Sequence, residues 1–491
     1  MSDTNQLEAG ADPRYQNIDY KSQLDDLTLV RDVEEGETAI KDKRHEYLPQ
    51  EPKESDKAYD IRLARSGWWD GTSKCKAALV GMVFRKPPVI GDGKASKLAP
   101  EIEAILDNID LQGNHLNVFT KVAFDQAMLD GHAFVFIDMA RPLDPQAATK
   151  SDEKGRRPFV RLVKKDQVIN WIEGKNEKGE IVATQATIHE CIKERMGRFG
   201  ELEVDQWRVL FLEDGFLHWE VWRVRQKEGG GEEVYVHESG DAPKIPFIPL
   251  VPIYTRRTGF WKSKPALLGL ARLNILHYQG WSDQKNILHR CRVPLLIFFG
   301  RGEEDKDVEI GPNAGLDMPA RPEGDAIYLE PTGAAIDSGR QEQLDTERLM
   351  GTMGLELLAP RSDVEVTATA TAVNDSSQIS ELGGMVEGLN DAANQFLWMI
   401  AIFLTLTQAG ALFAANKDFQ RLKITPEMLN SYDNLLVSGG IRVETLWWFM
   451  GRGEMLPPDF DPVKEKMGID AAVLAIPPAL QITDPTLGNV A

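Results

Sequence analysis

Three short stretches hold residue types that occur in catalytic sites, but each lacks part of the pattern that its chemistry needs. Gly91–Lys94 lacks the leading glycine and the following hydroxyl that would cradle a phosphate. His189 and Glu190 are not followed by the second histidine of a zinc protease. Gly280–Gln284 has a central serine without the closing glycine of a nucleophile elbow. The sequence therefore predicts a protein that is not an enzyme.

Acidic side chains gather between Gly300 and Pro331, in a segment rich in glycine and proline. Their oxygens suit a hard cation, but the ligand spacing and the glycine of an EF-hand loop are missing. We expect His277 and His289 to be core or interface residues, and we predict no metal and no cofactor. The acidic segment is either a solvated loop or a docking surface for a partner. Its candidate docking residues are Glu303, Glu304, Asp305, Asp307 and Glu309.

The charge of the chain bears on nucleic-acid binding. The 491 residues have a net charge of −20, the wrong sign for holding DNA tightly, because that affinity comes largely from Lys and Arg. In a channel through which DNA must slide, the same negative charge would be useful, because the wall would not hold the duplex. The alternative explanation of the negative charge is solubility. Trp207, Trp219 and Trp222 could stack on bases. They alternate with apolar residues and lack a basic stripe, which favours core and cross-strand packing.

Cysteines and hydropathy indicate the compartment. The three cysteines lie far apart without a CxxC pair, as is typical of a reducing compartment. The N-terminus has neither the basic nor the apolar region of a signal peptide. The most apolar run, Phe396–Leu406, has about 11 residues, whereas a membrane span needs about 20. We therefore expect a buried helix there and no membrane anchor.

Apolar periodicity predicts two long helices around an insertion. The first covers 265–292, with Pro265 at its start and Pro294 at its end. The second covers 337–358, and two short strands and the acidic loop lie between them. We expect a stalk that carries a small β module. The predicted apolar stripe of the first helix is Leu267, Leu270, Leu273, Ile275, Leu276, Ile287 and Leu288.

The other segments differ in pattern. Residues 1–57 are polar and dense in mixed charge, which predicts an arm that is flexible or orders against a neighbour. A strand is expected over His132–Asp138, and six strands in one antiparallel meander over Phe159–Pro249. A long helix follows over Asn374–Leu406, and Gly383–Gly384 within it predicts a kink or a close backbone contact. These elements indicate an α+β protein.

Five short stretches share a pattern with one known family. They are GMVFRKPP at 81–88, IPLVPIY at 248–254, PALLGLARLNILHY at 265–278, TATATA at 367–372 and SGGIRVET at 438–445. Together they resemble tailed-bacteriophage portal proteins, in particular a subgroup filed as a phage domain of unknown function. The resemblance covers roughly Tyr59 to Asp470 and consists of apolar and turn residues.

The resemblance implies a portal-like α+β fold with long radial and stem helices, an antiparallel β wing and a small β-containing clip. The implied parts are an N-terminal arm (1–57), a wing (58–255), a first stem helix (256–292), a clip (293–335), a second stem helix (336–358), a tunnel loop (359–373), a long wing helix (374–410) and a crown or C-terminal helical region (411–491).

The resemblance also implies a function and partners. About twelve copies would form a ring at one capsid vertex, the channel through which double-stranded DNA is packaged and ejected. The other partners would be the terminase packaging motor, a head–tail adaptor and the major capsid protein, with no membrane. The location would be the virion, after assembly in the host cytoplasm. The alternatives are another virion structural protein, such as a head–tail adaptor or capsid component, or a soluble enzyme of unknown type.

The expected DNA contacts are sparse. Basic residues of the first stem helix and small residues of the tunnel loop would line the channel. The candidates are Lys285, Arg290, Arg292, Thr367, Thr369 and Thr371. The loop could alternatively be an exposed strand that pairs with a neighbour.

The expected DNA-channel role of Arg290 can be tested by charge reversal. Replacing Arg290 with Glu should impair DNA retention or packaging, because a repelling carboxylate would face the phosphates, while the ring stays assembled. Packaged DNA per particle is the measurement. Normal packaging would remove Arg290 from the channel.

Overall fold

The computed structural model describes residues 12–90, 99–140, 156–227, 230–291, 295–299, 325–329, 334–356, 381–406, 412–417, 419, 426–453, 455–457 and 460–474. The chain forms two units, residues 1–417 and 418–491, and each is described by itself. The architecture combines helices with antiparallel sheets, so the predicted α+β class is confirmed.

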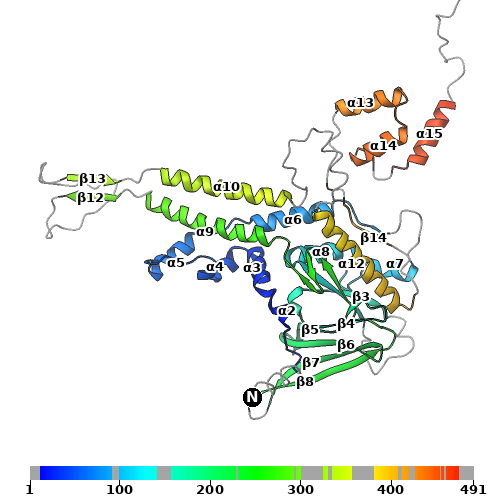
Figure 1. Cartoon of the computed structure of the whole chain (residues 1–491), viewed down its shortest axis with the longest axis horizontal. Helices are drawn as coiled ribbons and strands as arrows, with labels where there is room; N and C mark the ends of the chain where they lie inside the picture. Colours follow the sequence, from blue (N-terminus) through cyan, green and yellow to red (C-terminus); the bar gives the residue numbers. More distant parts are fainter. Residues whose placement is uncertain are drawn as a thin grey trace, which may run out of the picture. The chain divides into compact units, whose positions relative to one another are not determined.

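A three-stranded antiparallel sheet, in the order β3-β2-β9, lies at the centre of the first unit (Figure 1). Its strands are β2 (His132–Met139), β3 (Pro158–Val163) and β9 (Leu250–Tyr254). The first six residues of β2 are all buried. A strand covered on both faces has a nearly continuous apolar run, which is why this segment could be recognised as a strand from its sequence.

Two helices pack on this sheet, α8 (Leu116–Asp130) and α12 (Glu381–Phe403). They also touch each other through an edge-to-face contact of Phe119 and Phe396, whose ring centroids are 6.5 Å apart. Gly131 ends α8 with a φ of 89°, a left-handed conformation that glycine adopts without strain. A Cβ at Gly131 would lie 2.6 Å from the Oγ atom of Ser263.

A five-stranded antiparallel meander covers the other face of β2. Its strands, in both chain and sheet order, are β4 (Val168–Lys175), β5 (Ile181–Met196), β6 (Gly200–Glu213), β7 (Phe216–Gln226) and β8 (Glu232–Ala242). Phe134 and Phe136 of β2 share a core with Ile188 of β5 and Leu210 of β6.

The expected six-stranded meander is wrong in its first strand. β3 pairs with β2 instead of β4, with Val160 opposite Ile137. The 3-10 turn η3 (Lys165–Gln167) redirects the chain between β3 and β4. The expected packing of tryptophans is confirmed for Trp207 and Trp219, which lie against the core between the sheets.

The expectation of a flexible arm is wrong for residues 12–57, which form helices. These are α2 (Ile18–Lys21), α3 (Leu24–Glu35), α4 (Glu37–Asp42) and the 3-10 turn η1 (Arg44–Glu46). Leu27, Val30 and Val33 recur every third residue of α3 and are buried in one core. The many charged residues around them concealed this apolar face.

Further helices complete the first unit: α5 (Asp56–Arg65), α6 (Gly71–Val83), α7 (Pro100–Leu106), α9 (Leu268–Cys291) and α10 (Ala334–Glu356). The strand β12 (Leu295–Phe299) follows α9, and β13 (Asp325–Leu329) precedes α10. Two small antiparallel pairs remain: β1 (Val89–Ile90) with β14 (Phe413–Ala414), and β10 (Arg257–Gly259) with β11 (Lys262–Ser263).

The second unit contains α13 (Pro426–Val437), α14 (Val443–Arg452) and α15 (Pro462–Leu474). Among the side chains of this unit whose burial is described, none is buried. Within the described ranges of the whole chain, every helix is too short or too polar to cross a lipid bilayer.

The close backbone contact expected at Gly383–Gly384 is wrong for Gly384, and such a contact occurs instead one turn later, at Gly388. A Cβ at Gly388 would collide with the carbonyl oxygen of Tyr254 in β9, whereas a Cβ at Gly384 would have nothing within 4 Å. Glycine at position 388 therefore sets how closely α12 approaches the sheet.

Two alanine substitutions in α12 separate this contact from helix propensity. Gly388→Ala should lower the free energy of unfolding by about 1–3 kcal/mol, because the added methyl group meets rigid backbone. Gly384→Ala should be neutral or stabilise by up to about 1 kcal/mol, because alanine favours the helix. Urea unfolding measures both, and equal effects would contradict the close approach.

Candidate functional site

The helices α9 and α10 pack against each other as an antiparallel pair, here called the stalk, with β12 and β13 attached at one end (Figure 1). Glycines lie at their contact. Gly280 of α9 faces the amide of Gln343, and Gly339 of α10 faces the amide of Gln284. The side chain of Gln284 also donates to the carbonyl of Ile336 at 2.8 Å. Small residues thus let the two helices approach closely, with glutamines filling the space beside them.

The base of the stalk is held by polar residues on the buried side of α9. The Oδ1 atom of Asn274 accepts hydrogen bonds from the amide and the hydroxyl of Thr72, both at 3.1 Å. The Oγ atoms of Ser66 and Ser282 are 2.7 Å apart. All four of these residues are buried. Buried hydrogen bonds fix the register of α9 against α5 and α6, because a shift would leave the polar groups unpaired.

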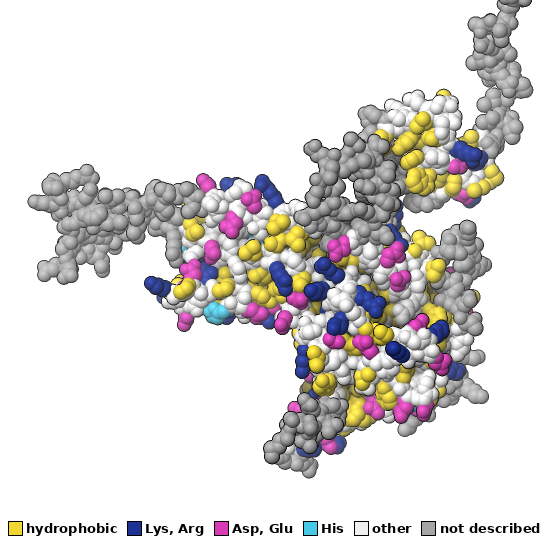
Figure 2. Space-filling view, in the orientation of Figure 1, with side chains coloured by type: hydrophobic (Ala, Val, Ile, Leu, Met, Phe, Trp, Pro, Cys, Tyr) yellow, Lys and Arg dark blue, Asp and Glu magenta, His cyan; other side chains and the backbone are white. Residues whose placement is uncertain are grey.

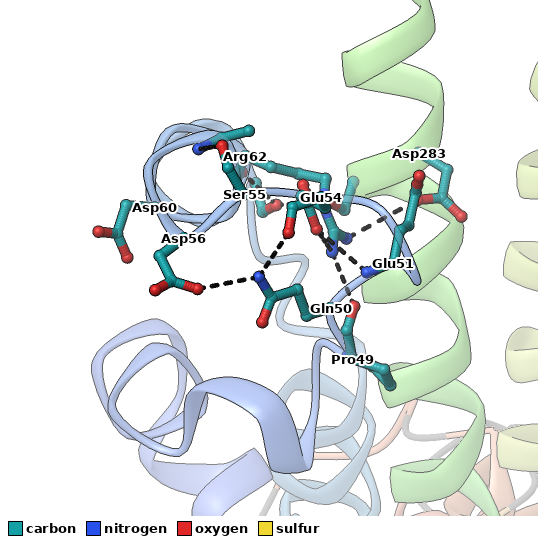
Figure 3. Close-up of polar contacts among 12 residues, drawn as sticks. Pro49, Gln50, Glu51, Glu54, Ser55, Asp56, Asp60, Arg62 and Asp283 are labelled. Atoms are coloured by element: carbon teal, nitrogen blue, oxygen red, sulfur yellow. Dashed lines mark hydrogen bonds and ion pairs between the residues drawn. The ribbon is translucent and has the colours of Figure 1, made fainter.

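A buried arginine joins α5 to the loop before it and faces α9 (Figure 3). The guanidinium of Arg62 donates two hydrogen bonds to the carboxylate of Glu54, at 2.9 and 2.8 Å, and one to the carbonyl of Pro49 at 2.7 Å. Asp283 of α9 lies 4.0 Å from the same guanidinium. Partial burial raises the pKa of Asp283, while Arg62 acts in the opposite direction.

His277 is the titratable group at the centre of the stalk. Its ring lies 3.2 Å from the carboxylate of Glu347 in α10 and packs beside Trp69 and Trp281. Burial lowers its pKa, although Glu347 favours the protonated form. The expectation that His277 is a core or interface residue is therefore confirmed, whereas His289 is exposed on the same helix.

The outer surface of the stalk exposes apolar side chains among charged ones (Figure 2). On α9, Leu276 is 53% exposed and Ile287 is 38% exposed; on α10, Leu344 is 37% and Leu349 is 47% exposed. The predicted apolar stripe is thus only partly buried. Leu267 and Leu270 are buried, but Leu276 and Ile287 face outward.

Most of the DNA-channel and docking residues predicted from the sequence lie outside the part of the chain that the structure describes. Lys285 is exposed on α9, with its Nζ atom 5.4 Å from the centre of the Trp281 ring. Arg290 belongs to α9, but its side chain is outside the described part. The remaining candidates also lie outside the described residues: Arg292, Thr367, Thr369, Thr371, Glu303, Glu304, Asp305, Asp307 and Glu309. Their roles stay predictions.

One buried group resembles a nucleophile with its base. The Oγ atom of Ser263 lies 2.6 Å from Nδ1 of His132, and Lys165 donates to the same oxygen at 3.3 Å. All three residues are at most 4% exposed. The cavity beside His132 and Lys165 has a volume of about 10 Å³, room for about one water molecule. Burial lowers the pKa of Lys165 to about 8. This group links β2, η3 and β11 and has no space for a substrate.

Sequence reasoning missed the polar anchors of the stalk. Asn274, His277 and Ser282 follow the same helical spacing as the buried Leu267 and Leu270. A search for apolar residues alone passes over them. These residues could have been found from their helical spacing alone, if polar residues had been included in the pattern.

Residues 266–404 match a domain of unknown function, DUF4055. The matched range includes both stalk helices and α12. No curated protein matches the sequence. One similar solved structure is described as the neck of an empty GTA particle computed with C6 symmetry. The identity is 12% and the TM-score 0.40, over 81% of this chain and 94% of that chain. A likeness at this level does not identify a function.

The Arg62 contact yields a matched pair of substitutions. Arg62→Ala should lower the free energy of unfolding by about 3–5 kcal/mol, because it removes the buried guanidinium that makes two hydrogen bonds to the carboxylate of Glu54 and one to the carbonyl of Pro49. Arg44→Ala removes the exposed pair with Asp60 and a cation–π contact with Tyr59 in the same region, and it should cost about 1 kcal/mol or less. Denaturant unfolding measures both variants. Equal effects would show that the Arg62 contact does not anchor α5.

Proposed function

We propose that this chain is the subunit of a portal ring, the channel through which double-stranded DNA enters and leaves a virion. The observation that carries the proposal is the stalk, two antiparallel helices with a β hairpin at one end. The sequence resemblance implies this order of elements for a stem and clip. In the proposal α9 and α10 are the stem, β12 and β13 belong to the clip, and the sheets with α12 form the wing.

The outer surface of the stalk supports assembly from several copies. A helix pair that buries only one side in its own chain leaves apolar residues in water, at a cost of about 25 cal/mol per Å² of apolar surface. Leu276, Ile287, Leu344 and Leu349 are such residues. Neighbouring stalks in a ring would cover them, and the polar anchors at the stalk base would hold each stalk at a fixed orientation.

The net charge of −20 supports a channel that does not retain DNA. Sparse cations such as the exposed Lys285 would contact phosphates, and the surrounding acidic wall would repel them. In this proposal the acidic clip segment binds the terminase motor or the adaptor, the wing meets the capsid protein, and the chain has no catalytic role. The alternative, another virion structural protein, would assemble without a central DNA channel.

The ring proposal can be tested on purified protein. The unmodified chain should form rings of about twelve copies, as measured by native mass spectrometry. Leu344→Ser combined with Leu349→Ser should shift the protein toward monomers, because the polar side chains weaken the contact between stalks. The matched control replaces two exposed valines of α8, Val118→Ser with Val122→Ser, which are 49% and 53% exposed.

The control variant should assemble like the unmodified chain, and both variants should keep its circular dichroism spectrum. The thermal unfolding midpoint of the stalk variant should fall, because assembly stabilises the folded chain. An unmodified chain that stays monomeric at all concentrations would refute the ring. Rings that survive the stalk substitutions would refute the stalk as the contact. Negative-stain images of the rings should show a central hole that admits a duplex.

A further inference from the structure

The hairpin of β5 and β6 extends beyond the sheet to which it belongs. β5 pairs with β4 only as far as Ile188, and β6 pairs with β7 only from Gln206 onward. Between these points β5 and β6 pair only with each other, up to Met196 opposite Gly200. Residues 189–205 therefore form a two-stranded ribbon, here called the arm.

The outer end of the arm is apolar. Phe199 at its tip is 90% exposed, Met196 is 61% exposed and Leu202 is 52% exposed. The register places Met196 and Leu202 on the same face of the ribbon. An isolated two-stranded ribbon is only marginally stable in water, and an exposed apolar end adds to the cost. A partner surface would remove this cost.

The inner end of the arm is held rigidly by charged groups. The carboxylate of Glu190 accepts from Arg208 at 2.9 Å and from Gln206 at 2.6 Å, and it also binds Arg161 of β3. Burial alone would raise the pKa of Glu190, but Arg208 and Arg161 lower it to about 2. Arg223 of β7 reaches the arm and binds Glu194 at 2.8 Å. The arm is thus a fixed projection of the sheet.

The turn of the arm, residues 195–200, has two arginines and no acidic residue, while Glu201 lies opposite Arg195 in the register. The guanidinium of Arg195 donates to the carbonyls of Gly197 and Arg198, and the guanidinium of Arg198 lies 5.1 Å from the centre of the Phe199 ring. Both arginines are exposed. A partner for this tip should combine an apolar contact with negative charge.

The same chain carries a surface with these properties at the edge of the five-stranded sheet. Among the described strands, β8 pairs only with β7, so its outer backbone groups are open to another strand. Residues 232–242 include four acidic residues and neither lysine nor arginine. Val236 in the middle of β8 is 42% exposed. The acidic residues are Glu232, Glu233, Glu238 and Asp241. Within its own chain Glu232 binds Arg14 at 2.8 Å and Glu233 binds Arg225 at 2.7 Å, so a second copy would add its arginines to these ion pairs.

We propose that the arm of one copy binds the β8 edge of a second copy. The arm adds to the neighbour's sheet, its apolar end covers Val236, and Arg195 and Arg198 face Glu232 and Glu233. The arm cannot reach β8 of its own chain, because β7 lies between them in the sheet. Two different surfaces joined in this way make a head-to-tail contact, the kind that closes into a ring. The inference rests on the proposed ring and names one of its contacts.

The test compares arm variants with a control in the same strand. Met196→Ser, Phe199→Ser and Leu202→Ser are combined in one variant. Ile181→Ser is the control, since Ile181 is 57% exposed but lies where β5 still pairs with β4. Native mass spectrometry over a concentration series measures assembly, and thermal unfolding of the monomer checks the fold. The arm variant should need at least tenfold more protein to assemble, and the control should assemble like the unmodified chain.

A charge exchange tests whether β8 is the surface that receives the arm. Arg195→Glu with Arg198→Glu should weaken assembly, and so should Glu232→Arg with Glu233→Arg. The second pair also breaks the ion pairs with Arg14 and Arg225 in the same chain, so thermal unfolding of its monomer is the control and the rescue is the deciding measurement. An equimolar mixture of the two reversed chains, or the fourfold variant, should restore it, because opposite charges again face each other. A fourfold variant that assembles no better than either double variant would overturn the assignment to β8.

The outcomes separate this inference from the ring itself. An unmodified ring that tolerates the arm substitutions would overturn the arm contact and leave the ring intact. An unmodified chain that never assembles would refute the ring, and the arm contact with it. Loss of assembly with the arm variant, together with rescue by charge exchange, supports both.

Discussion

The structure of the first unit depends on how α9 is held. This helix of 24 residues is anchored at its base by buried polar contacts from α5 and α6 and packs along its length against α10. Hydrogen bonds between buried groups are directional, so they determine one register, whereas apolar contacts alone tolerate sliding. The position of α9 and α10 relative to α5 and α6 follows from that register.

The N-terminal helices contribute to the same constraint. Their apolar residues share a core with Ala271 and Tyr278 of α9, and Arg31 binds Asp130 at the end of α8 at 2.8 Å. Residues 12–57 thus connect the stalk base to the central sheet. The first unit therefore combines segments that lie far apart in the sequence, and contacts between distant residues define it.

Much of the architecture could be predicted from local patterns, and the exceptions have physical causes. Strong periodicity indicated α9, α10, α12 and most of the meander, because each of these elements has many apolar residues at regular spacing. Strand pairing could not be predicted, since β3 is defined by its partner β2 and not by its own pattern. The polar anchors of α9 were hidden because Asn274 and Ser282 become core residues only once Thr72 and Ser66 are beside them. Charged and turn residues identified the acidic segment at 300–331 and the loop at 359–373. They could not predict the conformation of either segment.

The exposure of side chains in the second unit affects how cooperatively this unit should unfold. In α13, α14 and α15, none of the side chains whose burial is described is buried. Apolar residues such as Val437 and Trp448 are exposed to solvent. A sharp transition in calorimetry requires a hydrophobic core that unfolds cooperatively. Released by proteolysis, this fragment would melt gradually, each helix fraying from its ends, and it would gain a sharp transition only when other protein surface excludes water from it.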